Sequence, residues 1–482
     1  MSSSLKQKTI SGMIWSSLQR FGTMGISFIS NIVLARLLTP DDYGCIGMLM
    51  IFIALSNTFI DGGFGSALIQ KKRPTQEDYS TIFYWNIFLS VVLYAVLFIC
   101  APIIADFYNI ALLEKVLQVQ GVILVINALG IIQANQLRKQ LKFKSIAQVT
   151  LSASVISVVV AITMAYMGWG IWSLVAQQIV SSLVTTLLYW VYNSWRPLWI
   201  FSFKSFKELF NFGSFILLSS LINTFCRNLN GLLIGKFFNP SSMGYFTQAK
   251  KLEDVSSTSI EAVVSQVTYP VLVEVKDNPE RLNNALKQLN SLLLYIVTPL
   301  MLLLNLLAAP IISLLLGNQW LPAIAYLEIL AFQGIFISQE GVNYNAIASI
   351  GHSKSLLVST IVKRSIFILL LFMGMELGGI KGMLWGMTIS SFFVCFYNSA
   401  LVHKYIGYTL KKQFMDLLPI ILLNLISYIL SYSLRYFIHD KSLYLYVSVF
   451  IVYISSYVLF SIVFEINTIK KIKEVIIKIK HK

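Results

Sequence analysis

Charged residues are scarce in this chain of 482 residues. They make up 12% of the sequence, whereas 56% of the residues are hydrophobic and the mean hydropathy is +0.73. Soluble globular domains carry about twice that share of charge. The composition therefore excludes an ordinary soluble protein and indicates a chain that lies in a membrane.

Residues that form disulfides or bind metals are also few. The four histidines stand in loops and near chain ends without ligand spacing, so no metal or other cofactor is expected. The motif GxxxxGKS or GxxxxGKT is missing, so ATP is not the expected energy source. The connections are too short to hold an acid–base pair, which argues against a membrane enzyme. Four cysteines are dispersed without a CxxC pair, and we interpret them as packing residues: Cys45, Cys100, Cys226 and Cys395.

Long apolar runs, in contrast, recur along the whole chain. A helix needs about 20 apolar residues to cross a hydrocarbon layer of about 30 Å. The N-terminal MSSSLKQKT leads directly into the first run, so no cleavable signal peptide is expected. We predict an all-α integral membrane protein with fourteen spans, at 10–36, 43–70, 80–106, 113–135, 146–167, 170–192, 210–236, 243–273, 285–316, 321–348, 355–376, 380–402, 414–436 and 443–465.

The excess of basic residues follows the membrane. The chain has 37 Lys and Arg against 21 Asp and Glu, which gives a net charge of +16. Most of the cations fall on alternate connections, and such a bias sets orientation. We therefore predict that both termini are cytoplasmic, and the excess requires no nucleic-acid partner. In the tail 466–482, isoleucines and lysines occupy opposite helical faces, which predicts a helix in the membrane interface.

The chain contains an internal repeat. The stretch ARLLTPDDYG at 35–44 returns as GKFFNPSSMG at 235–244, and the short matches APII, KS, GI and SS recur in order at offsets of 208 to 210 residues. Consistent order and spacing indicate a duplication. We predict two six-span lobes, 1–203 and 204–405, related by a pseudo-two-fold axis along the membrane normal, and an extra pair of spans in 406–465. A cleft between the lobes is the expected substrate site.

The repeat carries the same three marks in each copy. A basic residue ends one span, and a proline and a glycine follow it. We interpret each set as a tight outer hairpin in which the proline stops one helix and the glycine permits the reversal. The matching pairs are Arg36 with Lys236, Pro40 with Pro240, and Gly44 with Gly244.

Charged side chains inside spans are the candidates for function. One such charge at mid-bilayer costs at least about 2.5–3.5 kcal/mol, so it needs water or a partner. The first two helices of each lobe carry most of them. The cations, which we predict to meet an anionic substrate, are Arg20, Arg227, Lys250 and Lys251, and the acids, which are candidates for proton or cation coupling, are Asp61, Glu253, Asp254 and Glu261.

Structural pairing is the alternative for several of these charges. Arg20 and Arg227 could pair with Asp61 or Glu261, and Lys250 could pair with the acid four residues later.

Two further features of the later spans have structural interpretations. Lys363 and Arg364 could face the cleft, extend to the interface or mark a misplaced span. Gly378, Gly382 and Gly386 form a series that is typical of a helix-packing surface.

Three stretches also carry a family resemblance: ISGMIWSSLQRFGTMGISFISNIVLARLLTPDDYGCIGM, FIDGGFGSALIQKK and YFTQAKKLEDVSSTSIEAVVSQVTYPVL. They resemble the polysaccharide transporter branch of the MOP superfamily, within it the Wzx-type flippases, and in particular the colanic-acid exporter type. The resemblance extends to about residue 465. It implies a bacterial inner-membrane protein of fourteen helices that moves undecaprenyl-diphosphate-linked oligosaccharides from the cytoplasmic to the periplasmic leaflet for surface polysaccharide synthesis.

The same resemblance implies how the substrate is met and which partners attend it. Cations in the cavity meet the diphosphate, and Arg20, Arg227, Lys250 and Lys251 are the candidates. A polysaccharide polymerase and chain-length proteins are the expected partners of a monomeric transporter that also contacts membrane lipid.

Two other classes stay open. A multidrug-type ion-coupled antiporter shares the two-lobe plan, although it favours an acidic and aromatic cavity over a basic one. A scaffold for polysaccharide assembly would tolerate the loss of the cavity charges, which a transporter would not.

Overall fold

The computed structural model describes residues 3–437 and 443–463, and all regular elements among them are helices. Side chains are described for these residues apart from 3–10, 258–267 and a few further positions. The chain divides into two compact units, residues 1–247 and 248–482. The amphipathic helix predicted for 466–482 lies outside the described residues.

Ten helical stretches in the described part of the chain are long and apolar enough to cross a membrane, which confirms a multi-pass helical membrane protein. Helices α1 (Ser3–Leu37), α10 (Pro240–Val275) and α13 (Ala323–Ser349) are not among them. These three helices hold several of the charged residues that the sequence places inside spans. They therefore depend on protein or water, rather than on lipid, to accommodate their polar side chains.

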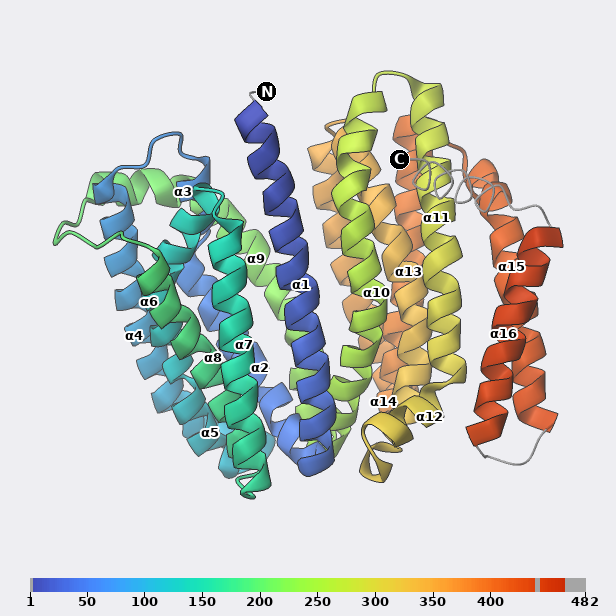
Figure 1. The fold of residues 1–482 in the computed structure, drawn as a ribbon, viewed down its shortest axis with the longest axis horizontal. Helices are drawn as coiled ribbons and strands as arrows, with labels where there is room; N and C mark the ends of the chain where they lie inside the picture. The colour runs from blue at the N-terminus through green and yellow to red at the C-terminus, as the bar shows by residue number, and fades with distance from the viewer. Residues whose placement is uncertain (1–2, 438–442, 464–482) are drawn as a thin grey trace. The chain divides into compact units, whose positions relative to one another are not determined.

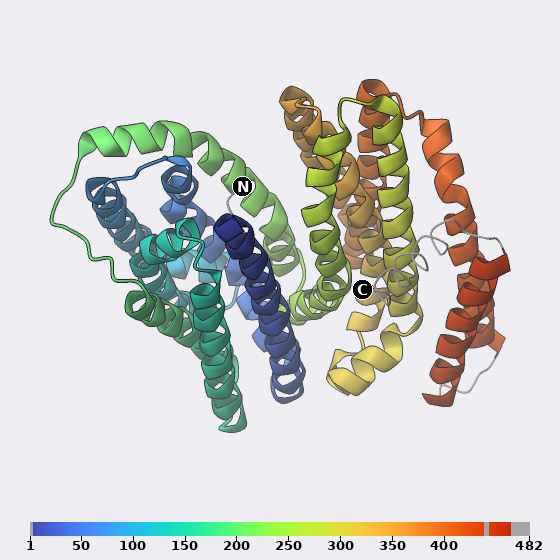
Figure 2. The same cartoon turned by 45° about the horizontal axis from the view of Figure 1, so that its top comes forward.

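Among the described residues, unit 1 contains nine complete helices and the first turns of α10 (Figure 1). Gly12 and Gly22 of α1 face Phe143 and Leu151 of α7, so these two helices lie side by side. The first part of α9 crosses near the ends of α3 and α4 (Figure 2). After α1, the helices are α2 (Pro40–Asp61), α3 (Phe64–Gln70), α4 (Gln76–Tyr108), α5 (Leu112–Gln120), α6 (Val122–Lys139), α7 (Phe143–Tyr166), α8 (Ile171–Tyr192) and α9 (Phe203–Phe237).

Helix α2 packs antiparallel against the second half of α9. A Cβ atom added at Gly231 would lie 2.8 Å from the carbonyl oxygen of Gly47. Farther along, the hydroxyls of Thr58 and Thr224 are 3.1 Å apart. Close backbone approach through small residues is the usual way in which helices associate inside a membrane, where hydrophobic burial gives little advantage.

The two repeated hairpins also lie in unit 1, and they touch each other. A Cβ at Gly44 would lie 1.9 Å from the carbonyl oxygen of Pro240, and a Cβ at Gly244 would lie 2.0 Å from that of Pro40. Ser241 donates a 2.5 Å hydrogen bond to Asp41 across the same contact. The repeated glycines therefore let two backbones meet.

This arrangement corrects the mechanism predicted for the hairpins. Pro40 occupies the first position of α2, where its missing N–H costs nothing. Thr39 and Asp42 form a capping box there, and at the start of α10 the side-chain oxygen of Asn239 accepts the backbone N–H of Ser242 at 2.8 Å. Two residues make each reversal, and Gly44 and Gly244 lie within the following helices. The tight hairpins are thus present, but the glycines do not form the turns.

Two later turns repeat in detail. Gly170, before α8, has φ 52° and ψ −130°, and Gly379, which follows it by 209 residues, has φ 55° and ψ −140°. Lys142 and His352, the N-cap residues of α7 and α14, have φ/ψ of −81°/55° and −79°/59°. Glycine is needed at the first pair because only it adopts that region without strain. Two pairs of positions that the predicted repeat relates therefore share a backbone conformation.

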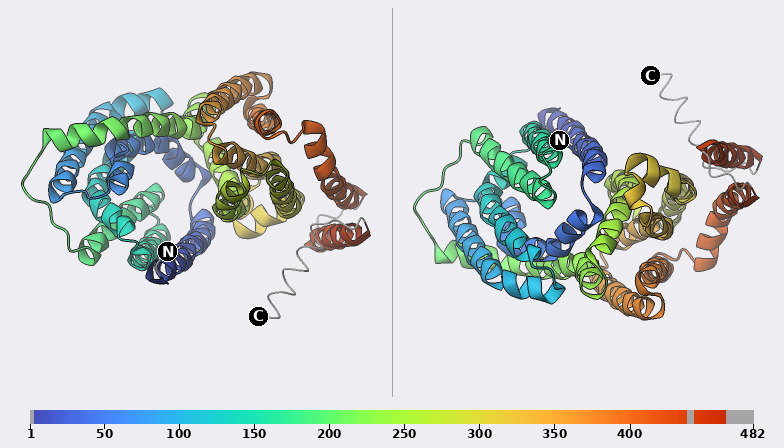
Figure 3. Two further views of the ribbon diagram at one scale, coloured as in Figure 1. Left: turned by 90° about the horizontal axis from the view of Figure 1, so that it is seen from above. Right: turned by 90° about the horizontal axis from the view of Figure 1, so that it is seen from below.

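Unit 2 holds the remaining helices, and α15 and α16 lie side by side at its edge (Figure 3). Helix α14 breaks at Gly378 and Gly379 into two antiparallel halves. A Cβ at Gly382 would lie 2.1 Å from the carbonyl oxygen of Gly374, so this glycine is a packing residue as predicted. Gly378 instead belongs to the turn. After α10, the elements are α11 (Pro279–Leu306), α12 (Ala308–Leu315), the 3-10 turn η1 (Asn318–Trp320), α13, α14 (Ser353–Ile406), α15 (Leu410–Phe437) and α16 (Leu443–Val463).

Candidate functional site

Three of the predicted site residues lie in unit 1. Arg20 on α1 and Arg227 on α9 have exposed side chains. Within the described part of the chain, Arg227 enters no ion pair. Asp61 is the last residue of α2, and the cation whose charge acts on it is Arg138 at the end of α6. Among the described residues Asp61 forms no ion pair with either arginine, and the other suggested partner, Glu261, has its side chain outside the described residues.

Lys71, in a connection between two predicted spans, links the start of α4 to α9. Lys71 lies 3.1 Å from Asp78 at the start of α4 and 3.1 Å from Glu208 on α9. The buried carboxylate of Asp78 also accepts a 2.8 Å hydrogen bond from the backbone N–H of Thr75. Burial lowers the pKa of Lys71, but its hydrogen bonds to the two carboxylates outweigh this effect and raise that pKa above its ordinary value.

The remaining predicted residues lie on α10 in unit 2, and three of them form one cluster. Lys250 contacts Glu253 directly and lies 3.1 Å from Asp254. The Glu253 side chain is fully buried, whereas that of Asp254 is 46% exposed. Lys251, next along the helix, is exposed. The side chain of Glu261 lies outside the described residues.

Glu253 also faces a neighbouring helix. A Cβ at Gly334 of α13 would lie 2.8 Å from its Oε1 atom, which is buried and has no hydrogen-bond partner among the described residues. The pairing alternative for Lys250 is thus the observed geometry. Whether Lys250 also meets substrate is a separate prediction.

The structure gives Lys363 a partner that its sequence neighbours did not reveal. Its Nζ atom lies 2.5 Å from Glu340 on α13, 23 residues earlier in the chain. Nearby in the same unit, Arg435 of α15 lies 3.3 Å from Glu328 of α13. The charges of α13 are therefore used in pairs, which reduces the cost of placing them inside a membrane protein.

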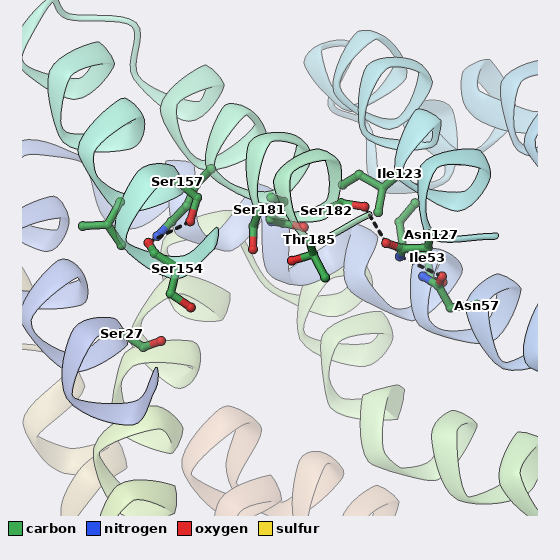
Figure 4. Close-up of a pocket in the computed structure, with 13 residues that line it drawn as sticks. Ser27, Ile53, Asn57, Ile123, Asn127, Ser154, Ser157, Ser181, Ser182 and Thr185 are labelled. Carbon is green, nitrogen blue, oxygen red and sulfur yellow. Dashed lines mark hydrogen bonds between the residues drawn. The ribbon is translucent and has the colours of Figure 1, made fainter. Parts of the chain in front are cut away.

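Unit 1 encloses a polar pocket of about 480 Å³ (Figure 4). Serine, threonine, asparagine and glutamine side chains from α1, α2, α6, α7 and α8 dominate its wall, and none of its 13 lining residues is charged. Ser182 donates to Oδ1 of Asn127, and Nδ2 of Asn127 donates to Oδ1 of Asn57 at 3.2 Å. This chain of hydrogen bonds fixes one side of the pocket.

Unit 2 holds a second pocket of the same volume, about 480 Å³, but of opposite character. Leucine, isoleucine and aromatic side chains dominate its wall. It lies between α11, α13, α14 and α15, and five phenylalanines contribute: Phe332, Phe336, Phe392, Phe396 and Phe414.

Neither pocket was found from the sequence. The wall of each pocket combines residues from four or five helices. In the sequence, the neutral polar residues of the first pocket look the same as those of any polar helix face. A spacing of four residues, as between Ser181 and Thr185 on α8, was the only available signal.

Comparisons with known proteins place the chain in a family. A model described as "Polysaccharide biosynthesis protein" matches residues 33–325, which is more than half of the chain. The chain belongs to this polysaccharide biosynthesis protein family. The matched range includes both repeated hairpins and the charged part of α10.

Curated relatives of the chain are named for the biosynthesis of teichuronic acid, lipopolysaccharide and succinoglycan. The teichuronic acid biosynthesis protein TuaB of Bacillus subtilis is 26% identical over 334 residues, which cover 69% of each chain. The lipopolysaccharide biosynthesis protein WzxC of Escherichia coli is 24% identical over 444 residues, with 89% of this chain and 88% of that protein covered. The succinoglycan biosynthesis transport protein ExoT of Rhizobium meliloti is 24% identical over 332 residues, 69% of this chain and 67% of that one.

Solved structures show the same fold. The lipid II flippase MurJ in an inward closed conformation aligns with a TM-score of 0.78 at 17% identity and covers 95% of this chain and 100% of its own. An inward-facing multidrug resistance MATE family transporter of the MOP superfamily aligns with a TM-score of 0.61 at 17% identity, covering 82% and 98%. The predicted resemblance to polysaccharide transporters is thereby confirmed, and the fold is shared with a transporter of the MOP superfamily.

Proposed function

We propose that this protein is an exporter that moves undecaprenyl-diphosphate-linked oligosaccharide from the cytoplasmic to the periplasmic leaflet of a bacterial inner membrane by alternating access. The names of the relatives and the fold shared with a lipid II flippase support transport of a lipid-linked polysaccharide precursor. The glycan would serve a surface polysaccharide such as O-antigen, exopolysaccharide or capsule.

The proposal includes a membrane topology. We propose fourteen spans, with both termini cytoplasmic, arranged as two six-span lobes (1–203 and 204–405) and an extra pair in 406–465. Each predicted span coincides with helix in the described residues, two of them being the halves of α14, which supports the count. The reciprocal hairpins and the repeated turns at Gly170 and Gly379 support the duplication.

The observation that carries the proposal is the position of two exposed arginines. Arg20 and Arg227 lie within about 6 Å, along their helices, of the middle of predicted spans. An exposed guanidinium at that depth cannot face hydrocarbon without a cost of at least about 2.5–3.5 kcal/mol. We therefore propose that both exposed side chains reach water, where their charge suits a diphosphate, whose bare transfer into an apolar medium costs tens of kcal/mol.

Other residues have subsidiary parts in the proposal. Lys250 and Lys251 are the further candidates for the diphosphate, and Asp61, Glu253, Asp254 and Glu261 are candidates for coupling export to a proton or cation gradient. The apolar pocket in unit 2 offers a surface of the same chemistry as a polyprenyl chain. The transporter would act as a monomer beside a polymerase and chain-length proteins.

The test is export in a strain that carries only the double variant Arg20→Ala/Arg227→Ala. Lipid-linked oligosaccharide should accumulate in the inner leaflet, as in a deletion strain, and surface polysaccharide should be lost while the protein stays in the membrane. Mass spectrometry of extracted lipids measures the accumulation, and a blot of membrane fractions measures the protein. The variant Arg36→Ala, at the end of α1, is the matched control and should export normally.

Wild-type surface polysaccharide in the double variant would remove the cationic site from the proposal. If the deletion strain accumulates no lipid-linked oligosaccharide and instead becomes sensitive to cationic drugs, the protein is an antiporter of the multidrug type.

A further inference from the structure

The neutral pocket in unit 1 has the chemistry of a site for hydroxyl groups. Asn57 and Asn127 have each used one of the two N–H donors of their side-chain amide. The hydroxyls of Ser181 and Thr185 on α8 also line the pocket. Such groups can both donate and accept, as sugar hydroxyls do.

The wall of the pocket also excludes other ligands. A diphosphate or a metal cation would need opposite charges, and none of the 13 lining residues carries one. Among the described residues, moreover, no group of three His, Cys, Asp or Glu side chains could hold a metal. A drug-like cation would lack both a carboxylate and an aromatic face here. Sugar residues, neutral and rich in hydroxyls, are the class that remains, and a volume of about 480 Å³ lies in the usual range for small-ligand sites.

One lining residue of the pocket lies on the same face of α1 as a proposed phosphate contact. Ser27 lines the pocket from α1, and Arg20 lies seven residues earlier in the same helix. Seven residues correspond to almost two full turns, so both side chains occupy one face of α1 and stand about 10.5 Å apart along it. A diphosphate at Arg20 would therefore hold its attached sugars toward Ser27.

We propose that the neutral pocket binds the first sugar residues of the lipid-linked glycan through their hydroxyls, separately from the cations that meet the diphosphate. The inference rests on the proposed export function. It assigns recognition of the glycan to α1, α2, α6, α7 and α8 in unit 1.

The experiment compares two ligands that differ only in the glycan. The full chain is purified into lipid nanodiscs, and its affinity is measured by native mass spectrometry for undecaprenyl diphosphate and for the undecaprenyl-diphosphate oligosaccharide extracted from the deletion strain. The pocket variant is Ser181→Ala/Thr185→Val. Its matched control, Ser152→Ala/Thr163→Val, makes the same changes at exposed positions on α7 outside the pocket.

The pocket variant should bind the oligosaccharide-bearing lipid about five- to 150-fold more weakly, as the loss of two neutral hydrogen bonds implies. Its affinity for undecaprenyl diphosphate should stay within about twofold of wild type, since the phosphate contacts are unchanged. Arg20→Ala should weaken both ligands, and the α7 control neither. The thermal midpoint of each variant shows that it is folded.

Two results would overturn the inference in different ways. Suppose that wild type binds both ligands and that the pocket variant shows no selective loss of affinity for the oligosaccharide-bearing lipid. The pocket then does not recognise sugars, and the export function stands. If no lipid-linked oligosaccharide accumulates in the deletion strain and wild type does not bind undecaprenyl diphosphate, the export function fails and the pocket assignment fails with it.

Discussion

Gly44 offers the sharpest test of the packing between the repeated hairpins. In Gly44→Ala the new Cβ would lie 1.9 Å from the carbonyl oxygen of Pro240. Real Cβ atoms essentially never lie closer than 3.0 Å to such an atom. The first turns of α2 and α10 must therefore separate by about 1 Å or more. Both groups belong to backbone, so no side-chain rotation relieves the clash.

Overpacking of this kind typically costs about 1–3 kcal/mol. Alanine recovers about 0.5–1 kcal/mol because it loses less backbone entropy than glycine in a helix. The net expectation is a destabilisation of up to about 2.5 kcal/mol, centred near about 1 kcal/mol, or a fall of about 2–4 °C in the thermal midpoint for each kcal/mol in a unit of this size. Gly244→Ala should behave alike, and the double variant should cost less than the sum because both changes open one contact.

The assay is thermal unfolding of the purified chain in detergent, with export measured in parallel. Gly25→Ala is the matched control, because Gly25 also lies inside a helix but a Cβ there would meet no atom within 4 Å. It should be neutral or slightly stabilising. A Gly44→Ala protein as stable as the Gly25→Ala protein would refute the contact between the hairpins.

Three further substitutions follow from the same reasoning. Lys250→Ala should destabilise the protein by about 3 kcal/mol in chemical denaturation, because it leaves the buried Glu253 carboxylate unpaired. Lys71→Met should cost about 1 kcal/mol at neutral pH. Since the pKa of Lys71 is raised in the folded state, this difference from wild type should persist below the ordinary lysine pKa and disappear as the pH rises through the folded-state value. Gly382→Ala should lower the thermal midpoint by several degrees, whereas Gly378→Ala, in open space, should not.

Each of these expectations has a result that contradicts it. A Lys250→Ala protein that unfolds with wild-type stability would mean that Glu253 is neutral or reaches water. A Lys71→Met difference that grows above pH 10 would reverse the sign of the linkage. Equal effects at Gly382 and Gly378 would show that the halves of α14 are not in backbone contact.

Much of the helical framework could be predicted because it depends on local properties. Apolar runs of span length stand out against polar connections, and each coincides with helix in the structure. The predicted spans left a break between 376 and 380, and the structure places the turn there, at Gly378 and Gly379, although Gly378 was interpreted as a packing residue. The repeat was detectable because the same few small residues recur at nearly constant spacing.

The contacts between helices could not be read from the sequence. Lys71 reaches Glu208, 137 residues away, and Lys363 reaches Glu340, and nothing in their immediate neighbours indicates either partner. The role of Gly44 was assigned wrongly for the same reason, since a glycine that lets two backbones meet has the same letter as one that makes a turn. Of the predicted charges, the pairing of Lys250 with the acids on its own helix was accessible, because helical periodicity alone brings them together.

The hairpin contact has one more implication. The proline of each repeat lies against the glycine of the other, so both sides of the junction use the same atoms. Reciprocity of this kind is what two identical subunits show across a dimer interface. A half-length ancestor bearing this Pro and Gly pair would already possess a self-complementary surface, and duplication would have joined, within one chain, two copies that were able to associate as separate molecules.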